Sequence, residues 1–130
     1  MPAAAATKII VEAGYEHAAG HLNLAFLSAY QRDFETARRR YKSAWKKKPD
    51  MQLVNRACEF LKWLAKRHPE RAPVCYWCLG MILSNNPDDQ AAAFRYFEIA
   101  LQRLDDLPPT EVAHLQQIVR PLELGQEKGP

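Results

Sequence analysis

Residues 18–49 read AAGHLNLAFLSAYQRDFETARRRYKSAWKKKP, and they carry the strongest structural pattern of the sequence. Large and small residues recur in it at helical spacing, and a proline follows them; the residues are His21, Leu24, Ala25, Phe34, Ala37, Tyr41 and Ala44, followed by Pro49. Two antiparallel helices cross closely only where small residues lie at the contact and bulky residues fill the space beside it. The pattern predicts a pair of packed helices, in which Asp33 is the N-cap of the second helix and Pro49 marks its end.

This order of large, large, small, aromatic, small, aromatic, small and proline resembles a tetratricopeptide repeat. A second copy follows, with its first helix at Tyr76, Leu79 and Gly80 and its second at Ala93, Phe97 and Ala100. The first-helix residues lie 55 positions after their counterparts and the second-helix residues 56 after theirs, so one residue is added in the turn at 85–89. The resemblance covers residues 18–105 and implies an all-α, right-handed stack of about six antiparallel helices, a fragment of an α-solenoid.

The apolar periodicity predicts where these helices lie. They are expected at residues 7–30, 34–47, 51–67, 73–84 and 88–105, with a sixth after Pro108 and Pro109. The third has an apolar face of Val54, Ala57, Cys58, Leu61, Leu64 and Ala65. The sixth places Val112, Leu115, Ile118 and Val119 on one side, which suits a helix that caps the stack. The expected organisation is one domain over 1–120 and a flexible tail over 121–130.

Composition agrees with a folded domain, since 48% of the residues are hydrophobic. No apolar run approaches the roughly 18 residues that span a bilayer, and the first residues lack the basic flank and apolar block of a signal peptide. Three cysteines in such a chain predict reduced thiols and a cytoplasmic location. Residues 1–72 carry 14 Lys and Arg against 7 Asp and Glu, whereas residues 73–130 carry 4 against 8.

In a stack of this kind the first helix of each repeat lines the inner groove. The residues predicted to line it are Leu22, Phe26, Tyr30, Trp77, Met81 and Asn85. Domains of this family that capture acidic chaperone tails use Lys and Asn there, whereas this chain has Leu22 and Phe26. An apolar groove favours an apolar or amphipathic segment of a partner protein, so the predicted function is that of an adaptor or small chaperone. The alternative is that the chain's own terminal helices bury these residues.

Arg38, Lys42 and Lys46 form a basic stripe at i, i+4 and i+8 on the second helix. Such a stripe can follow phosphates, so RNA or phosphate binding is the first alternative function. It can equally be a solvated face, which is the more common role of a charge run. Self-assembly through the edge of the stack, giving a homo-oligomer, is the second alternative.

No metal, cofactor or catalytic activity is predicted. Cys75 and Cys78 have the spacing of half a zinc site without a second pair, and they suit small buried thiols instead. His17 and His21 are one helical turn apart, but Ala18 stands where a zinc protease has Glu. A packing role for His21 fits the pattern better. No glycine-rich phosphate loop or nucleophile elbow occurs in the sequence.

Overall fold

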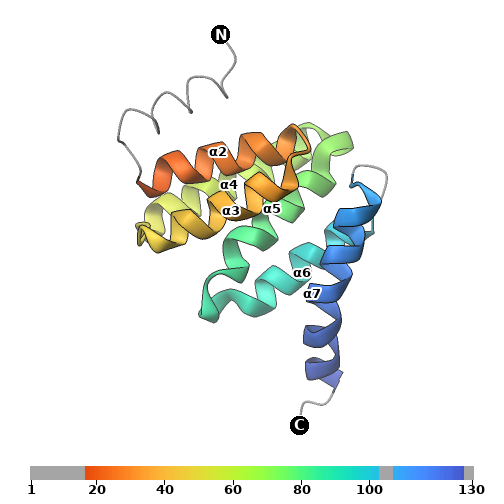
Figure 1. Ribbon diagram of the computed structural model, residues 1–130. Helices are drawn as coiled ribbons and strands as arrows, with labels where there is room; N and C mark the ends of the chain where they lie inside the picture. The colour runs from red at the N-terminus through yellow and green to blue at the C-terminus, as the bar shows by residue number, and fades with distance from the viewer. Residues whose placement is uncertain (1–16, 103–106, 128–130) are drawn as a thin grey trace. The chain divides into compact units, whose positions relative to one another are not determined.

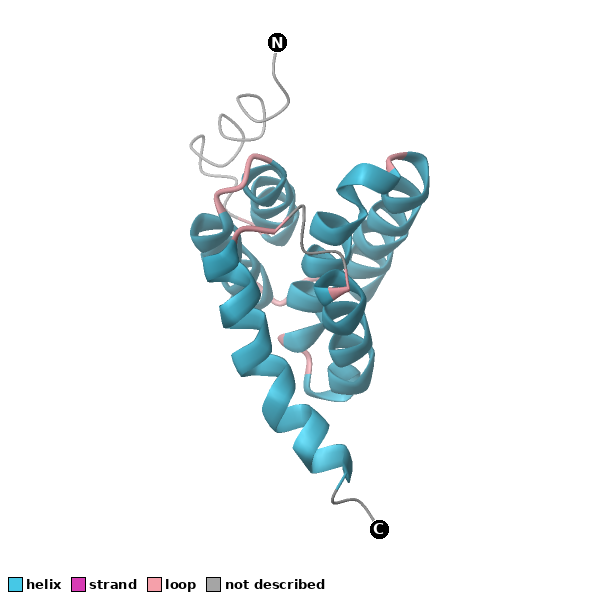
Figure 2. Cartoon of the chain, turned by 90° about the vertical axis from the view of Figure 1, so that its right-hand side faces the viewer, coloured by secondary structure: helices cyan, strands magenta, loops and turns pink. Residues whose placement is uncertain are grey.

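The computed structural model describes residues 17–102 and 107–127, with side chains described as far as Arg120. Within these ranges every regular element is a helix and no strand occurs (Figure 2), so the described chain is all-α, as predicted. The chain divides into two compact units, residues 1–60 and 61–130, where the sequence predicts one domain over 1–120. The two units are therefore described separately.

The first unit is built on a hairpin of α2 (Ala18–Tyr30) and α3 (Phe34–Lys46), which lie side by side (Figure 1). Small residues on both helices have no exposed surface; they are Ala25, Ala29, Ala37 and Ala44. Phe34 and Tyr41 are buried beside them. Methyl side chains at the crossing let the two backbones approach closely, and the aromatic rings fill the space that this leaves.

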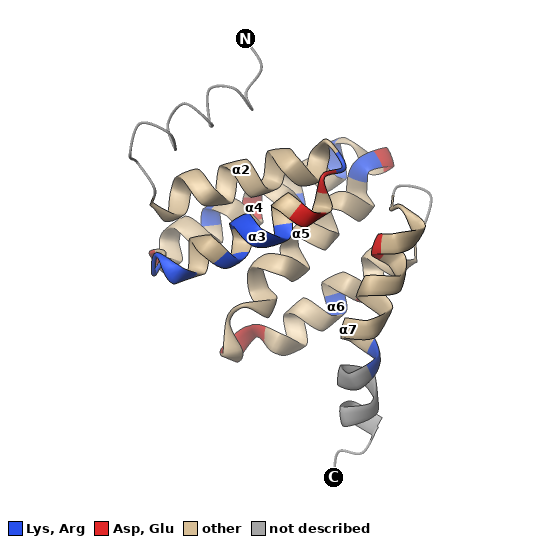
Figure 3. Cartoon of the chain, in the orientation of Figure 1, with Lys and Arg blue, Asp and Glu red and all other residues tan. Residues whose placement is uncertain are grey.

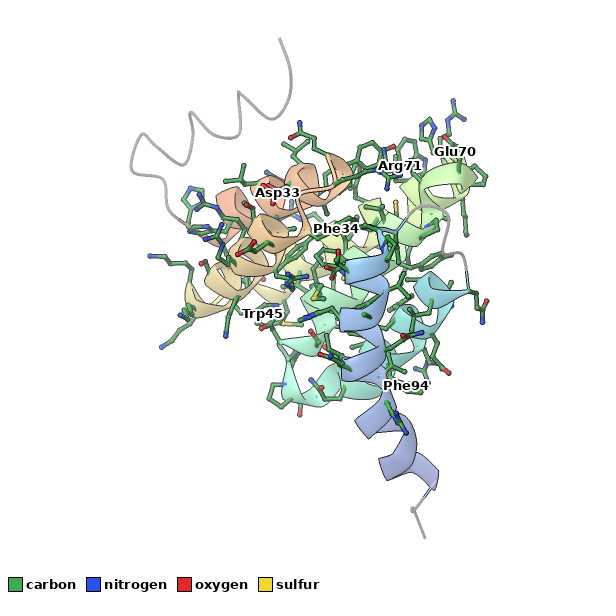
Figure 4. All side chains as sticks on the ribbon, turned by 45° about the vertical axis from the view of Figure 1, so that its right-hand side comes forward. Asp33, Phe34, Trp45, Glu70, Arg71 and Phe94 are labelled. Atoms are coloured by element: carbon green, nitrogen blue, oxygen red, sulfur yellow. The ribbon has the colours of Figure 1, made fainter. Side chains whose placement is uncertain are left out.

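A connection of three residues turns the chain between α2 and α3. Arg32 adopts a left-handed backbone with φ of 70°, and the next residue, Asp33, caps α3. Its carboxylate accepts a hydrogen bond of 3.2 Å from the Thr36 backbone N–H. The hydrogen bonds from Thr36, aided by the charge of Arg39, hold the pKa of Asp33 below its ordinary value of 3.8. The predicted N-cap is confirmed, and Figure 4 shows Asp33 beside Phe34 where α3 begins.

The boundary between the units falls inside α4 (Met51–Arg67), after Phe60. The predicted apolar face is buried at Val54, Cys58, Leu61, Leu64 and Ala65, and Ala57 is half-buried. Three large apolar residues of α4 nevertheless remain exposed: Met51, Phe60 and Trp63. The helix therefore has an apolar component outside its core-facing side.

The second unit contains a hairpin of α5 (Ala72–Ser84) and α6 (Gln90–Leu101), with α7 (Pro109–Glu127) packed on α6. Short 3₁₀ turns precede the two hairpin helices, η1 (Pro69–Arg71) and η2 (Pro87–Asp89). Most of α5 is buried, from Pro73 to Ile82 with Tyr76 half-exposed. A helix that is apolar on all sides needs cover on all sides, which accounts for the position of α5 in the core of this unit.

Gly80 lies at a close contact between α5 and α6. A Cβ atom at this position would lie less than 3.0 Å from the ring of Phe97, a distance that real Cβ atoms do not show. Phe97 itself has no exposed surface. The missing side chain of Gly80 therefore makes room for the ring, which is the close helix contact that the sequence predicts for this copy.

The boundaries of the helices are close to those predicted. α2 to α5 end within one residue of the expected positions, whereas α6 begins two residues later because η2 takes up 87–89. The predicted segments 7–16 and 103–105 lie outside the described residues. α7 continues to Glu127, so residues 121–127 of the predicted tail are helical.

Among the described helices, none is both long enough and apolar enough to cross a lipid bilayer.

Candidate functional site

Three aromatic rings gather on the first unit. Phe26 and Tyr30 lie one turn apart on α2, with ring centroids 5.4 Å apart and ring planes tilted by 41°. Phe60 of α4 meets Phe26 edge to face, at a centroid distance of 5.3 Å and an angle of 86°. Both distances fall within the range of favourable aromatic pairs, so each ring holds its neighbour in place. We call Phe26, Tyr30 and Phe60 the aromatic surface.

The aromatic surface is open to solvent. Phe60 is 44% exposed, and Phe26 and Tyr30 are half-buried. Leu22, one turn before Phe26, is buried at 5% exposure and belongs to the core beneath the rings. Rigid aromatic groups that are partly exposed and already ordered lose little side-chain entropy on binding, which is why such groups often dominate the energy of protein interfaces.

The predicted groove residues of the second unit lie in its core. Trp77 has no exposed surface, and its indole N–H donates a hydrogen bond of 2.8 Å to the Glu111 carboxylate of α7. Met81 is buried as well. These two side chains therefore present no open surface to a partner in this structure. For Trp77, the contact with α7 agrees with the alternative stated from the sequence, in which the chain's own terminal helices bury the predicted groove residues.

Asn85 has a local structural role. Its side-chain amide donates a hydrogen bond of 2.8 Å to the Met81 carbonyl, one of the carbonyls that the end of α5 leaves without a helical partner. The prediction that Phe26 and Trp77 share one concave surface concerns both units and stays a prediction.

Phe60 is the member of the site that sequence reasoning missed. It follows Glu59 and precedes Leu61, so it lies between the polar and apolar faces of α4 and was assigned to neither. A signal was present, because Phe60 and Trp63 are two large exposed apolar residues three positions apart, off the core-facing side of one helix. Neighbouring exposed apolar residues of this size indicate a surface that another segment covers.

The predicted basic stripe lies at the surface of α3. Lys42 and Lys46 are exposed and Arg38 is half-exposed, and Figure 3 shows Lys and Arg along this helix. Whether the stripe binds phosphates stays a prediction.

The cysteines and histidines are dispersed. All three cysteines are buried and none forms a disulfide bond, and within the described ranges no three His, Cys, Asp or Glu residues lie close enough to hold a metal ion. His17 is exposed, whereas His21 is buried in α2 with its Nδ1 3.5 Å from Arg40 Nη1 of α3. His21 thus takes part in the contact between the two helices, in agreement with the packing role expected for it.

Comparison with family models, curated proteins and solved structures finds no match to this chain.

Proposed function

We propose that this protein is an interaction module, an adaptor or small chaperone, whose first unit binds an acidic amphipathic helix of a partner protein. The observation that supports this most is the aromatic surface, in which Phe26 orders Phe60 while Phe60 remains 44% exposed. The apolar side of an incoming helix would cover these rings and remove them from water.

The charge around the aromatic surface favours an acidic partner. Residues 1–60 carry 10 Lys and Arg against 6 Asp and Glu. Arg56 lies one turn before Phe60 on α4, on the same side of the helix, and its side chain is exposed. Acidic residues that flank the apolar side of the partner helix would meet these cations at the rim, where they speed association and fix orientation.

The proposal extends to the fold. Both hairpins resemble tetratricopeptide repeats in spacing, and we infer that they are degenerate repeats of that type in a right-handed stack. Their correspondence supports this inference: four buried residues of the first hairpin, Ala25, Ala37, Tyr41 and Ala44, have buried counterparts 55 or 56 positions later in Gly80, Ala93, Phe97 and Ala100. RNA or phosphate binding and self-assembly remain the alternatives that the experiment below separates from peptide binding.

The test compares Phe60→Ser with a matched control, Met51→Ser. Both residues are exposed and both lie on α4, but their separation of nine positions places them on opposite sides of the helix. Partners would be captured from native extract with each variant and quantified by mass spectrometry. A synthetic peptide of the recovered acidic segment would then be titrated against each variant. We expect Phe60→Ser to weaken peptide binding by about 2 kcal/mol, as a residue at the centre of an interface does, and Met51→Ser to leave it unchanged.

Three outcomes would contradict the proposal. Equal binding by wild type and Phe60→Ser would exclude the aromatic surface. Capture that nuclease abolishes would favour nucleic acid as the ligand. A concentration-dependent dimer that Phe60→Ser dissociates would favour self-assembly, which sedimentation of the purified chain detects.

A further inference from the structure

An open polar pocket lies on α3. Its lining consists of Thr36, Arg39, Arg40 and Ser43, and its volume is about 250 Å³. These residues are at i, i+3, i+4 and i+7, so they follow one side of the helix for two turns. The pocket exceeds by several times the roughly 30 Å³ that one water molecule occupies in the liquid, which leaves room for a tetrahedral anion.

In the part of the chain that the structure describes, neither guanidinium of the pocket forms a salt bridge with an acid. Arg39 Nη2 donates a hydrogen bond of 3.3 Å to Thr36 Oγ1, and Arg40 Nη1 lies 3.5 Å from His21 Nδ1. Among the described residues no carboxylate lies within salt-bridge distance of either guanidinium. Two neighbouring cations that no salt bridge neutralises repel each other, and an anion between them offsets that repulsion.

The contacts of Arg39 and Arg40 also limit their freedom. The hydroxyl of Thr36 holds one guanidinium near the helix, while the buried His21 ring on α2 lies against the other. Donors that are held in place before binding lose less entropy when a ligand arrives. Each guanidinium keeps further N–H groups for a ligand, because the group has five.

We propose that this pocket binds a phosphate monoester. A monoester has three free oxygens and nearly two negative charges at neutral pH, which suits two guanidinium groups and the hydroxyls of Thr36 and Ser43. A phosphodiester offers only two free oxygens and one charge, so it satisfies fewer of these donors. The monoester comes either from a phosphorylated residue of a peptide or from a small phosphorylated metabolite.

The pocket is distinct from the basic stripe. Arg38, Lys42 and Lys46 follow a different side of α3, about 100° of helical rotation away from the pocket residues. This separation provides a matched control, because Arg38→Gln with Lys42→Gln removes the same charge from the same helix as Arg39→Gln with Arg40→Gln.

The experiment is a titration of the full chain with inorganic phosphate at constant ionic strength, followed by nuclear magnetic resonance of backbone amides and arginine Nε–H groups. We expect saturable shifts at Thr36, Arg39, Arg40 and Ser43. Arg39→Gln with Arg40→Gln should weaken binding about tenfold or more, since charge-assisted hydrogen bonds are the strong ones, whereas the control pair should change it less than about twofold, since exposed charges off the pocket are screened by salt.

Asp33→Asn provides a second and opposite test. The positive charge of Arg39 contributes to lowering the pKa of Asp33, so the Asp33 carboxylate interacts electrostatically with the pocket. Asparagine at this position keeps the helix cap without the charge. We expect this variant to bind phosphate more tightly, because a repelling charge is removed. A phosphoserine peptide that binds more tightly than inorganic phosphate would identify a peptide source, and equal binding of phosphate and a phosphorylated sugar would identify a metabolite.

Two results would overturn the proposal. Shifts that spread evenly over α3, with equal losses in the two double variants, would mean that phosphate only senses the net charge of the helix. Tighter binding of a short RNA than of any monoester, lost in the control pair, would assign phosphate recognition to the basic stripe instead.

Discussion

The hairpins of the two units use the same spacing with different residues. Ala25 and Tyr41 in α2 and α3 correspond to Gly80 and Phe97 in α5 and α6, and all four are buried. Ala37 and Ala44 likewise correspond to Ala93 and Ala100. The contact between the helices therefore accepts only small changes, because close packing leaves no room for others.

A second pair of equivalent positions varies far more. His21 and Arg40 meet across the first hairpin at 3.5 Å, and their counterparts 55 and 56 positions later, Tyr76 and Tyr96, stack with centroids 6.0 Å apart and an angle of 17°. Both pairs bridge the two helices of their hairpin, one through polar atoms and the other through rings. We call the buried small and aromatic residues at the contact between the two helices the seam of each hairpin. The seam keeps the same residue types in both units, whereas the bridging pair changes from polar to aromatic. The two units therefore differ at the bridging pair.

The largest effect should come from truncating the aromatic residue of each seam. Phe97→Ala and Tyr41→Ala each remove a fully buried ring, and each should cost about 3–5 kcal/mol of unfolding free energy. Urea unfolding followed by circular dichroism measures both. A cost below about 1 kcal/mol for one of them would mean that the two positions are not equivalent.

Gly80→Ala tests a steric difference between the hairpins, since the first has Ala25 at the position where the second has Gly80 beneath the Phe97 ring. The added methyl group meets the Phe97 ring, so we expect a loss of about 1–3 kcal/mol. Phe97→Leu in the same chain should relieve part of that loss, because the flat ring no longer lies over the new methyl group. A double-mutant cycle in thermal or urea unfolding measures the coupling; additive losses would show that the methyl group is accommodated elsewhere.

Glu111 distinguishes the second unit, because its carboxylate is buried and accepts from the Trp77 indole. Glu111→Ala removes that acceptor and should cost about 1–3 kcal/mol. Glu111→Gln keeps an acceptor oxygen and should cost less. Hydrogen exchange of α7 locates the loss; if the two variants behave alike, the indole contact does not hold α7 in place.

The seam of each hairpin could be predicted from sequence, because steric limits at a close crossing allow few residue types. The cap at Asp33 and the buried side of α4 could also be predicted, because the local geometry of a helix determines them. The site was harder. The acceptor for Trp77 lies 34 residues away on α7, and no local spacing links the two. Phe60 was missed because its exposure depends on how α4 packs against α2, which the periodicity of α4 alone does not determine.

The smallest effect concerns the start of α3 and its dependence on pH. Asp33 caps this helix with a carboxylate, whereas Asn86 caps the turn before α6 with an amide that accepts from the Asp88 N–H. The lowered pKa of Asp33 means that its ionised form stabilises the fold at pH values above its ordinary pKa of 3.8 and that this contribution is lost as the pH falls through the lower folded pKa.

Asp33→Ala should cost about 1 kcal/mol at neutral pH, and less in acid, where the wild-type cap is protonated. Asp33→Asn makes the first hairpin resemble the second and should show no such pH dependence from this position. Melting temperatures of wild type, Asp33→Ala and Asp33→Asn are measured between neutral pH and about pH 2.5. The difference in melting temperature between wild type and each variant should shrink in acid, whereas the difference between the two variants should not. A constant gap between wild type and Asp33→Asn across this range would show that the charge of Asp33 contributes nothing to its role as a cap.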